Sequence, residues 1–78
     1  MPRYYFHFND GRRTFTDGVG LELTGVAQAR SHAAKHIREM RDSLSEHEIP
    51  DWSDWTMVVV DQAGKTVCKI GFDLKPIL

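Results

Sequence analysis

The chain has 78 residues and one cysteine, with ten Lys and Arg against eleven Asp and Glu. This length fits a single small domain spanning residues 1–78, and the net charge of −1 argues against general binding to polyanions. A lone cysteine excludes an intramolecular disulfide, and no apolar run is long enough to span a bilayer, so we expect a cytoplasmic protein without membrane association.

The first predicted element is a strand over residues 3–8, where the side chains alternate between two faces. One face carries the aromatic side chains of Tyr4, Phe6 and Phe8, and the other carries Arg3, Tyr5 and His7. The Asn9-Asp10-Gly11 segment is typical of a hairpin turn, because these residues tolerate a positive φ. We therefore expect a return strand over residues 12–16, with Phe15 on the apolar face.

A loop over residues 17–20 follows, after which Leu21 and Leu23 are expected to dock against the core. A helix of about five turns is predicted to begin with Thr24 as its N-cap and to end before Pro50. Its apolar stripe recurs at spacings of three and four residues: Val26, Ala29, Ala33, Ile37, Met40 and Leu44.

The second half of the chain reads as another hairpin, with strands over residues 55–61 and 66–72 joined by a turn at residues 61–64. The order of elements is then ββαββ. We predict an α+β fold in which one helix packs on a four-stranded, mainly antiparallel sheet, with the aromatic row of the first hairpin against the helix stripe.

The strand over residues 55–61 carries two valines, Val58 and Val60, on the side away from the helix. One helix covers only one face of a sheet, so something else must cover these valines. We expect Trp52 and the C-terminal segment 74–78 to do so, and a second copy of the chain is the alternative.

Several motifs are shared with a known family. The opening Pro2-Arg3-Tyr4-Tyr5-Phe6-His7 and the Asp10-Gly11 turn carry the resemblance most specifically. It continues through Gly20-Leu21-Glu22-Leu23, Ala29-Arg30, Ala33, Val60-Asp61, Gly64 and Phe72. The chain thus resembles a family of short uncharacterised bacterial proteins that is classed only as a domain of unknown function. The resemblance implies the fold and supplies no activity, ligand or site residue.

Aromatic and basic side chains are predicted to share the polar side of the first hairpin. The candidate binding residues, including one from a basic face of the helix, are Arg3, Tyr5, His7, Arg12 and Arg38. Aromatic rings can stack on unpaired bases while cations contact phosphates, so this set suggests binding of single-stranded nucleic acid. An ordinary solvated sheet surface is the competing interpretation, because tyrosine is simply a good strand residue.

His32 and His36 lie four residues apart on the predicted helix and could ligate a metal, with His47 or His7 as a third ligand. The sequence HAAKH lacks the glutamate that metalloproteases place after the first histidine, so we expect a helix flank, no metal and no cofactor. Cys68 lies in a predicted strand without a catalytic signature around it. We therefore expect no enzymatic activity.

The function predicted from the sequence is a small non-enzymatic interaction module that binds an unknown protein partner or a second copy of itself. Binding of single-stranded nucleic acid through the first hairpin is the alternative. Binding of a metal or small ligand through His32 and His36 is a third hypothesis.

Overall fold

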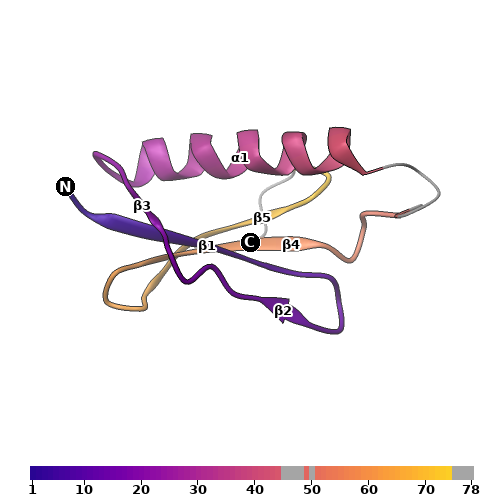
Figure 1. Cartoon of the computed structure of the whole chain (residues 1–78), viewed down its shortest axis with the longest axis horizontal. Helices are drawn as coiled ribbons and strands as arrows, with labels where there is room; N and C mark the ends of the chain where they lie inside the picture. Colours follow the sequence, from indigo (N-terminus) through magenta and orange to yellow (C-terminus); the bar gives the residue numbers. More distant parts are fainter. Residues whose placement is uncertain (45–48, 50, 75–78) are drawn as a thin grey trace.

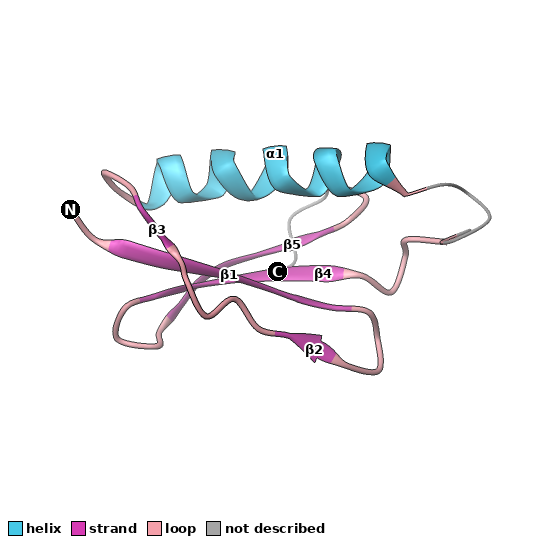
Figure 2. Cartoon of the chain, in the orientation of Figure 1, coloured by secondary structure: helices cyan, strands magenta, loops and turns pink. Residues whose placement is uncertain are grey.

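The computed structural model describes residues 1–44, 49 and 51–74 and has two layers, a helix and a sheet (Figure 1). The helix lies across one face of the sheet (Figure 2). The elements in chain order are β1 (Arg3–Asn9), β2 (Thr14–Phe15), β3 (Leu21–Glu22), α1 (Val26–Ser43), β4 (Thr56–Asp61) and β5 (Thr66–Gly71). The predicted α+β fold, with one helix on an antiparallel sheet, is confirmed.

The sheet is built around β1. One edge of β1 pairs with β4 along residues 4–9. Its other edge is shared, because β3 pairs with Arg3 and Tyr4 whereas β2 pairs with Phe8 and Asn9. The strand order is β2-β1-β4-β5, with β3 beside β2 on the outer edge of β1, and all these pairs are antiparallel.

The sheet has five strands rather than the predicted four. The expected return strand over residues 12–16 is shortened to Thr14–Phe15, and residues 21–22 form the additional strand β3. Between them, a carboxylate oxygen of Asp17 accepts a hydrogen bond from the backbone N–H of Phe6. A side chain thus takes the place of a continuous partner strand at the middle of β1.

The core lies between α1 and the sheet and consists mainly of apolar side chains that point toward each other. Its buried members are Tyr4, Phe6, Met57, Val59, Ile70 and Phe72 on the sheet side and Ala29, Ala33 and Ile37 on the helix side. Two of the helix residues are alanines, so the helix backbone approaches the sheet closely. The predicted stripe is confirmed at its centre but not at Val26, which lies in the first turn and is 41% exposed.

The helix begins differently from the prediction, because its N-cap is Gly25 and no side chain caps it. Instead, the Gln28 side chain accepts a hydrogen bond from the backbone N–H of Thr24 at 3.1 Å. Near the other end, the Arg41 guanidinium donates to the Phe72 carbonyl at 2.9 Å and ties α1 to the chain beyond β5. Within the part of the chain that the structure describes, no helix is long and apolar enough to cross a membrane.

Trp52 packs on the helix side of the sheet, so the prediction that it covers the opposite face is wrong. Its ring is stacked on that of Phe72, with centroids 5.4 Å apart and planes 10° from parallel. A buried aromatic ring offers an indole more apolar contact than two valines do. Leu74 also packs against the core, whereas Pro50 and residues 75–78 lie outside the described residues.

The face of the sheet turned away from α1, which we call the open face, has no described helix over it (Figure 2). Strand register places on it the side chains of Tyr5, His7, Val58, Val60 and Lys69. The two valines are only partly exposed, because the larger neighbours in the adjacent strands flank them. The open face is therefore mixed in character rather than a bare apolar patch.

Candidate functional site

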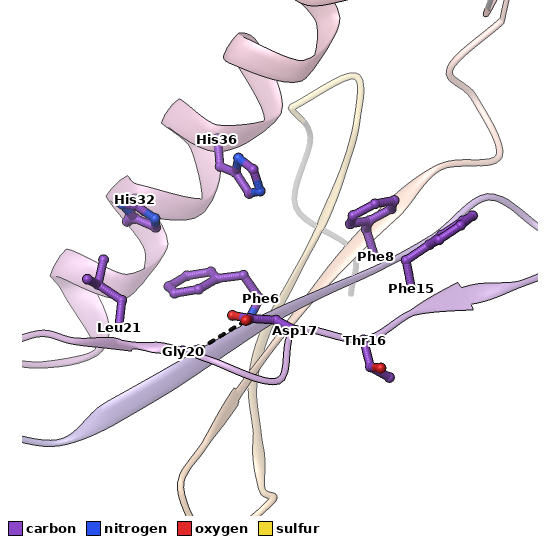
Figure 3. Close-up of a pocket in the computed structure, with 9 residues that line it drawn as sticks. All are labelled: Phe6, Phe8, Phe15, Thr16, Asp17, Gly20, Leu21, His32 and His36. Atoms are coloured by element: carbon purple, nitrogen blue, oxygen red, sulfur yellow. Dashed lines mark hydrogen bonds between the residues drawn. The ribbon is translucent and has the colours of Figure 1, made fainter.

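A pocket lies between α1 and the segment that joins β2 to β3 (Figure 3). Its volume is about 370 Å³, near the lower end of the range of roughly 300–1,000 Å³ found for small-molecule sites. The residues that line it are Phe6, Phe8, Phe15, Thr16, Asp17, Gly20, Leu21, His32 and His36. We call it the α1–β1 pocket.

One wall of the α1–β1 pocket is aromatic and consists of Phe6, Phe8 and Phe15. Phe8 and Phe15 are opposite each other in the β1–β2 pair, and their rings stack with centroids 4.8 Å apart. The guanidinium of Arg13 lies over the Phe15 ring, 5.3 Å from its centroid. Phe8 also stacks on Trp55 at 5.9 Å, so the wall is supported from behind by a second ring.

Asp17 supplies the charge of the pocket. One carboxylate oxygen accepts hydrogen bonds from the N–H groups of Val19 at 2.9 Å and Gly20 at 3.0 Å, and the other accepts from that of Phe6 at 3.2 Å. Burial raises the pKa of this carboxyl, but the three N–H donors and the nearby His7 outweigh it and hold the pKa below its ordinary 3.8. Asp17 is therefore a carboxylate at neutral pH.

Two residues of β1 hold the segment around Asp17 against the sheet edge. The Nδ1 atom of His7 accepts a hydrogen bond from the Asp17 backbone N–H at 2.9 Å. The Arg3 guanidinium donates to the Val19 carbonyl at 2.8 Å and forms an ion pair with Glu22 at 3.3 Å. Arg3 and His7, two of the predicted binding residues, thus use their polar groups to position the wall of the pocket.

The close approach of this segment to β1 requires a glycine at position 20. Gly20 has a φ of +74°, in the left-handed region that favours glycine. A Cβ built there would lie 2.8 Å from a ring carbon of Tyr5, 2.9 Å from the Arg3 side chain and 2.9 Å from the Tyr4 carbonyl oxygen. Tyr5, the third predicted binding residue on β1, therefore packs its ring against the loop backbone.

The side of the pocket formed by α1 carries His32 and His36, one turn apart on the helix (Figure 3). The His32 ring lies 4.7 Å from that of Phe6 and 6.3 Å from that of His36, between centroids. Burial lowers the pKa of His32, and the positive charges of His36 and Lys35 lower it further. His32 is therefore mainly neutral at pH 7.

The described residues do not bring a third metal ligand to the two helix histidines. Among residues 1–44, 49 and 51–74, no three His, Cys, Asp or Glu side chains converge in a way that could hold a metal ion. His7 uses its Nδ1 atom to accept the bond from Asp17. His47, the other predicted third ligand, lies outside the described residues.

The five predicted binding residues do not form one surface. Arg3, Tyr5 and His7 extend from β1 and contact the β2–β3 segment. Arg12 lies in the exposed hairpin turn, where its backbone N–H donates to the Asp10 side chain. Arg38 is exposed on α1, in the other layer. A single ligand would have to cross the edge of the sheet to reach all of them.

Sequence reasoning missed the residues that do converge, because it treated Phe6, Phe8 and Phe15 only as core and residues 17–20 only as a loop. Phe8 and Phe15 are half-buried and stay accessible from the pocket. The Asp17-Gly18-Val19-Gly20 segment contained a usable signal, since an aspartate followed two and three residues later by free N–H groups forms a side-chain turn.

The amino-acid sequence shows which protein family the chain belongs to. Searches of curated proteins and of solved structures gave no match. Residues 3–73, nearly the whole chain, match the family described as Domain of unknown function (DUF6894). The prediction that the chain falls into a domain family of unknown function is thus confirmed, and the chain belongs to this family.

Proposed function

We propose that the protein is a non-enzymatic binding module and that the α1–β1 pocket is its ligand site. One observation carries this proposal: an anchored carboxylate, Asp17, and the aromatic wall face the same space of about 370 Å³. Ligand sites are typically concave and mostly apolar, with a few fixed polar groups that orient the ligand. The pocket has this composition.

Binding rather than catalysis is supported by the way the polar groups are used. The carboxylate of Asp17 already accepts three backbone hydrogen bonds, and its lowered pKa makes it a weak base. Cys68 pairs with Val59 inside the sheet and does not line the pocket. Asp51 is exposed and accepts a hydrogen bond from the Ser53 N–H, as expected of a solvated loop carboxylate.

The test is an NMR titration of isotopically labelled protein with small neutral aromatic compounds, such as indole and benzyl alcohol, added one at a time. We expect saturable shifts at Phe15, Asp17, Leu21 and His32. Phe15→Ala should remove them by opening the wall of the pocket, whereas Val58→Ala, which also truncates a side chain but lies on the open face, should leave them intact. Shifts centred on the open face, or no saturable shift with any compound, would contradict the proposal.

Binding of single-stranded nucleic acid remains the alternative proposal, and the geometry supports it less. Arg3 is paired with Glu22 and the Val19 carbonyl, and His7 accepts a backbone hydrogen bond, so neither is free to act as an independent phosphate contact. Arg12 and Arg38 lie on different parts of the molecule. Loss of affinity with rising salt would be the signature of phosphate binding.

Self-association through the open face also stays a prediction. Its support is the pair of valines, Val58 and Val60, on a face with no described helix over it. Other exposed large apolar side chains include Val19, Leu21 and Val26, which lie between β2 and β3, on β3 and at the start of α1. A protein partner other than a second copy could bind either the open face or this second group of exposed apolar side chains.

A further inference from the structure

We infer that the α1–β1 pocket selects a small organic cation, a protonated amine that carries an apolar group, over neutral and anionic molecules of the same shape. This inference rests on the proposed function, since it names the chemical class of ligand for the same pocket. Three features of the pocket support it: its charge, the unused hydrogen-bonding capacity of Asp17 and the aromatic wall.

The charge of the pocket is negative. Among the described residues that line it, Asp17 is the one acidic residue, and none is Lys or Arg. A charged ligand group that enters this space loses part of its hydration, so a group of opposite sign to Asp17 is favoured and an anion is excluded.

The Asp17 carboxylate also has hydrogen-bonding capacity left. A carboxylate has about four acceptor positions, and the backbone donors of Val19, Gly20 and Phe6 occupy three of them. The oxygen bonded to Phe6 accepts only that one bond from the described residues. An ammonium group can donate to the remaining position without breaking the turn.

The aromatic wall favours the same kind of ligand. A cation over the face of an aromatic ring is attracted by the ring quadrupole. The wall already makes such a contact, since the Arg13 guanidinium lies over Phe15 at 5.3 Å. The rings of Phe6 and Phe8 meanwhile offer apolar contact for the body of the ligand.

His32, on the helix side of the pocket, makes the affinity for a cation depend on pH. His32 is mainly neutral at pH 7, because burial and the charges of His36 and Lys35 lower its pKa. Glu39 opposes this shift from the next turn of α1, and Asp17 faces the helix from the sheet edge. Acidification adds positive charge to His32, so binding of a cation must weaken as the pH is lowered from 7.5 through the pKa of His32.

The experiment compares three probes with one phenyl ring each and a different charge: 2-phenylethylamine, 2-phenylethanol and 3-phenylpropanoate. Each is titrated by NMR into the labelled protein at pH 7.5 and low salt. We expect the amine to bind about tenfold more tightly than the alcohol, with shifts at Asp17, Gly20 and His32, and the carboxylate to bind most weakly. Added salt should weaken binding of the amine and leave that of the alcohol unchanged.

Variants at two acidic positions test the source of the preference. Asp17→Asn should reduce the affinity for the amine to that for the alcohol, whereas Asp42→Asn, at an exposed carboxyl on α1 that does not line the pocket, should leave the preference unchanged. Should Asp17→Asn fail to fold, the salt and pH series on the unaltered protein test the same inference.

The outcomes separate the two proposals. Equal or tighter binding of the alcohol or the carboxylate in the pocket would overturn the preference for a cation and keep the pocket as a ligand site. Absence of saturable shifts with all three probes would overturn both. Tighter binding of the amine that persists unchanged in Asp17→Asn, or in high salt, would also overturn the inference, because Asp17 would not be its source.

Discussion

Replacement of Asp17 should destabilise the fold more than replacement of any other described aspartate or glutamate. Asp17→Ala removes the acceptor of three backbone hydrogen bonds, and the Phe6 N–H, in the middle of the β1 edge, loses its only described partner. Bonds to a charged acceptor contribute about 1.5–3 kcal/mol each, but the N–H groups of Val19 and Gly20 can turn to water. We therefore expect a loss of about 3 kcal/mol, a large part of the roughly 4–12 kcal/mol typical of a domain of this size.

Asp17→Asn is the more conservative variant and adds a pH test. Its amide can still accept from Val19 and Gly20 but turns a donor toward the Phe6 N–H, so we expect a loss of about 2 kcal/mol. The folded-state pKa of Asp17 is lowered, so the stability that its charge contributes is present above the ordinary value of 3.8 and is lost as the pH falls through the folded-state pKa. The difference between the unaltered protein and Asp17→Asn should thus shrink below about pH 4.

Urea unfolding followed by tryptophan fluorescence measures these differences, because Trp52 stacks on the buried ring of Phe72. Asp42→Asn, an exposed carboxyl on α1, is the matched control and should leave the unfolding midpoint unchanged. A loss of less than about 1 kcal/mol for Asp17→Ala would refute the view that its carboxylate replaces a strand partner at the middle of β1. A difference for Asp17→Asn that stays constant down to pH 2.5 would refute the role of the charge.

Four further measurements follow from the structure. Gly20→Ala should cost about 2–3 kcal/mol, because the new Cβ would meet both side chains and backbone, whereas Gly18→Ala, with no atom within 4 Å, should be nearly neutral in the same urea assay. Ile37→Ala should cost about 2–5 kcal/mol, since this side chain is fully buried, and retained stability would contradict the assigned core. In an NMR pH titration, His32 should titrate below the ordinary 6.5, and a midpoint at or above it would contradict its burial. If the open face self-associates, sedimentation should reveal a concentration-dependent dimer that Val58→Lys abolishes, and a monomer at all concentrations would remove that prediction.

Sequence periodicity predicted the elements whose pattern is set by burial. The alternation over residues 3–8 correctly assigned Tyr4 and Phe6 to the core face. The spacing of Ala29, Ala33 and Ile37 correctly identified the side of α1 that faces the core. These residues follow simple periods, because one side of each element faces the same apolar layer. The antiparallel sheet and the single helix followed from them.

The pocket could not be predicted in this way, because it depends on contacts between side chains and backbone that have no period. Asp17 bonds to Phe6 across eleven positions, and His7 bonds to Asp17 across ten. The same is true of Trp52, whose stacking partner Phe72 lies far along the sequence. The residue types alone leave many partners open to Asp17 and His7, and the register of β1 with β2 and β3 decides among them.

The position of β1 in the sheet has a consequence for the order in which the protein can be assembled as it is synthesised. β1 is synthesised before its main partner, because its longest pairing is with β4, some fifty residues later in the chain. Until then only the short pairs with β2 and β3, together with Asp17, can shield its edge, and Tyr4 and Phe6 remain without their neighbours from β4. Closing so long a loop is slow compared with forming local contacts. We therefore expect the Asp17 turn to bond to the edge of β1, which is otherwise prone to aggregation, while the rest of the domain is synthesised.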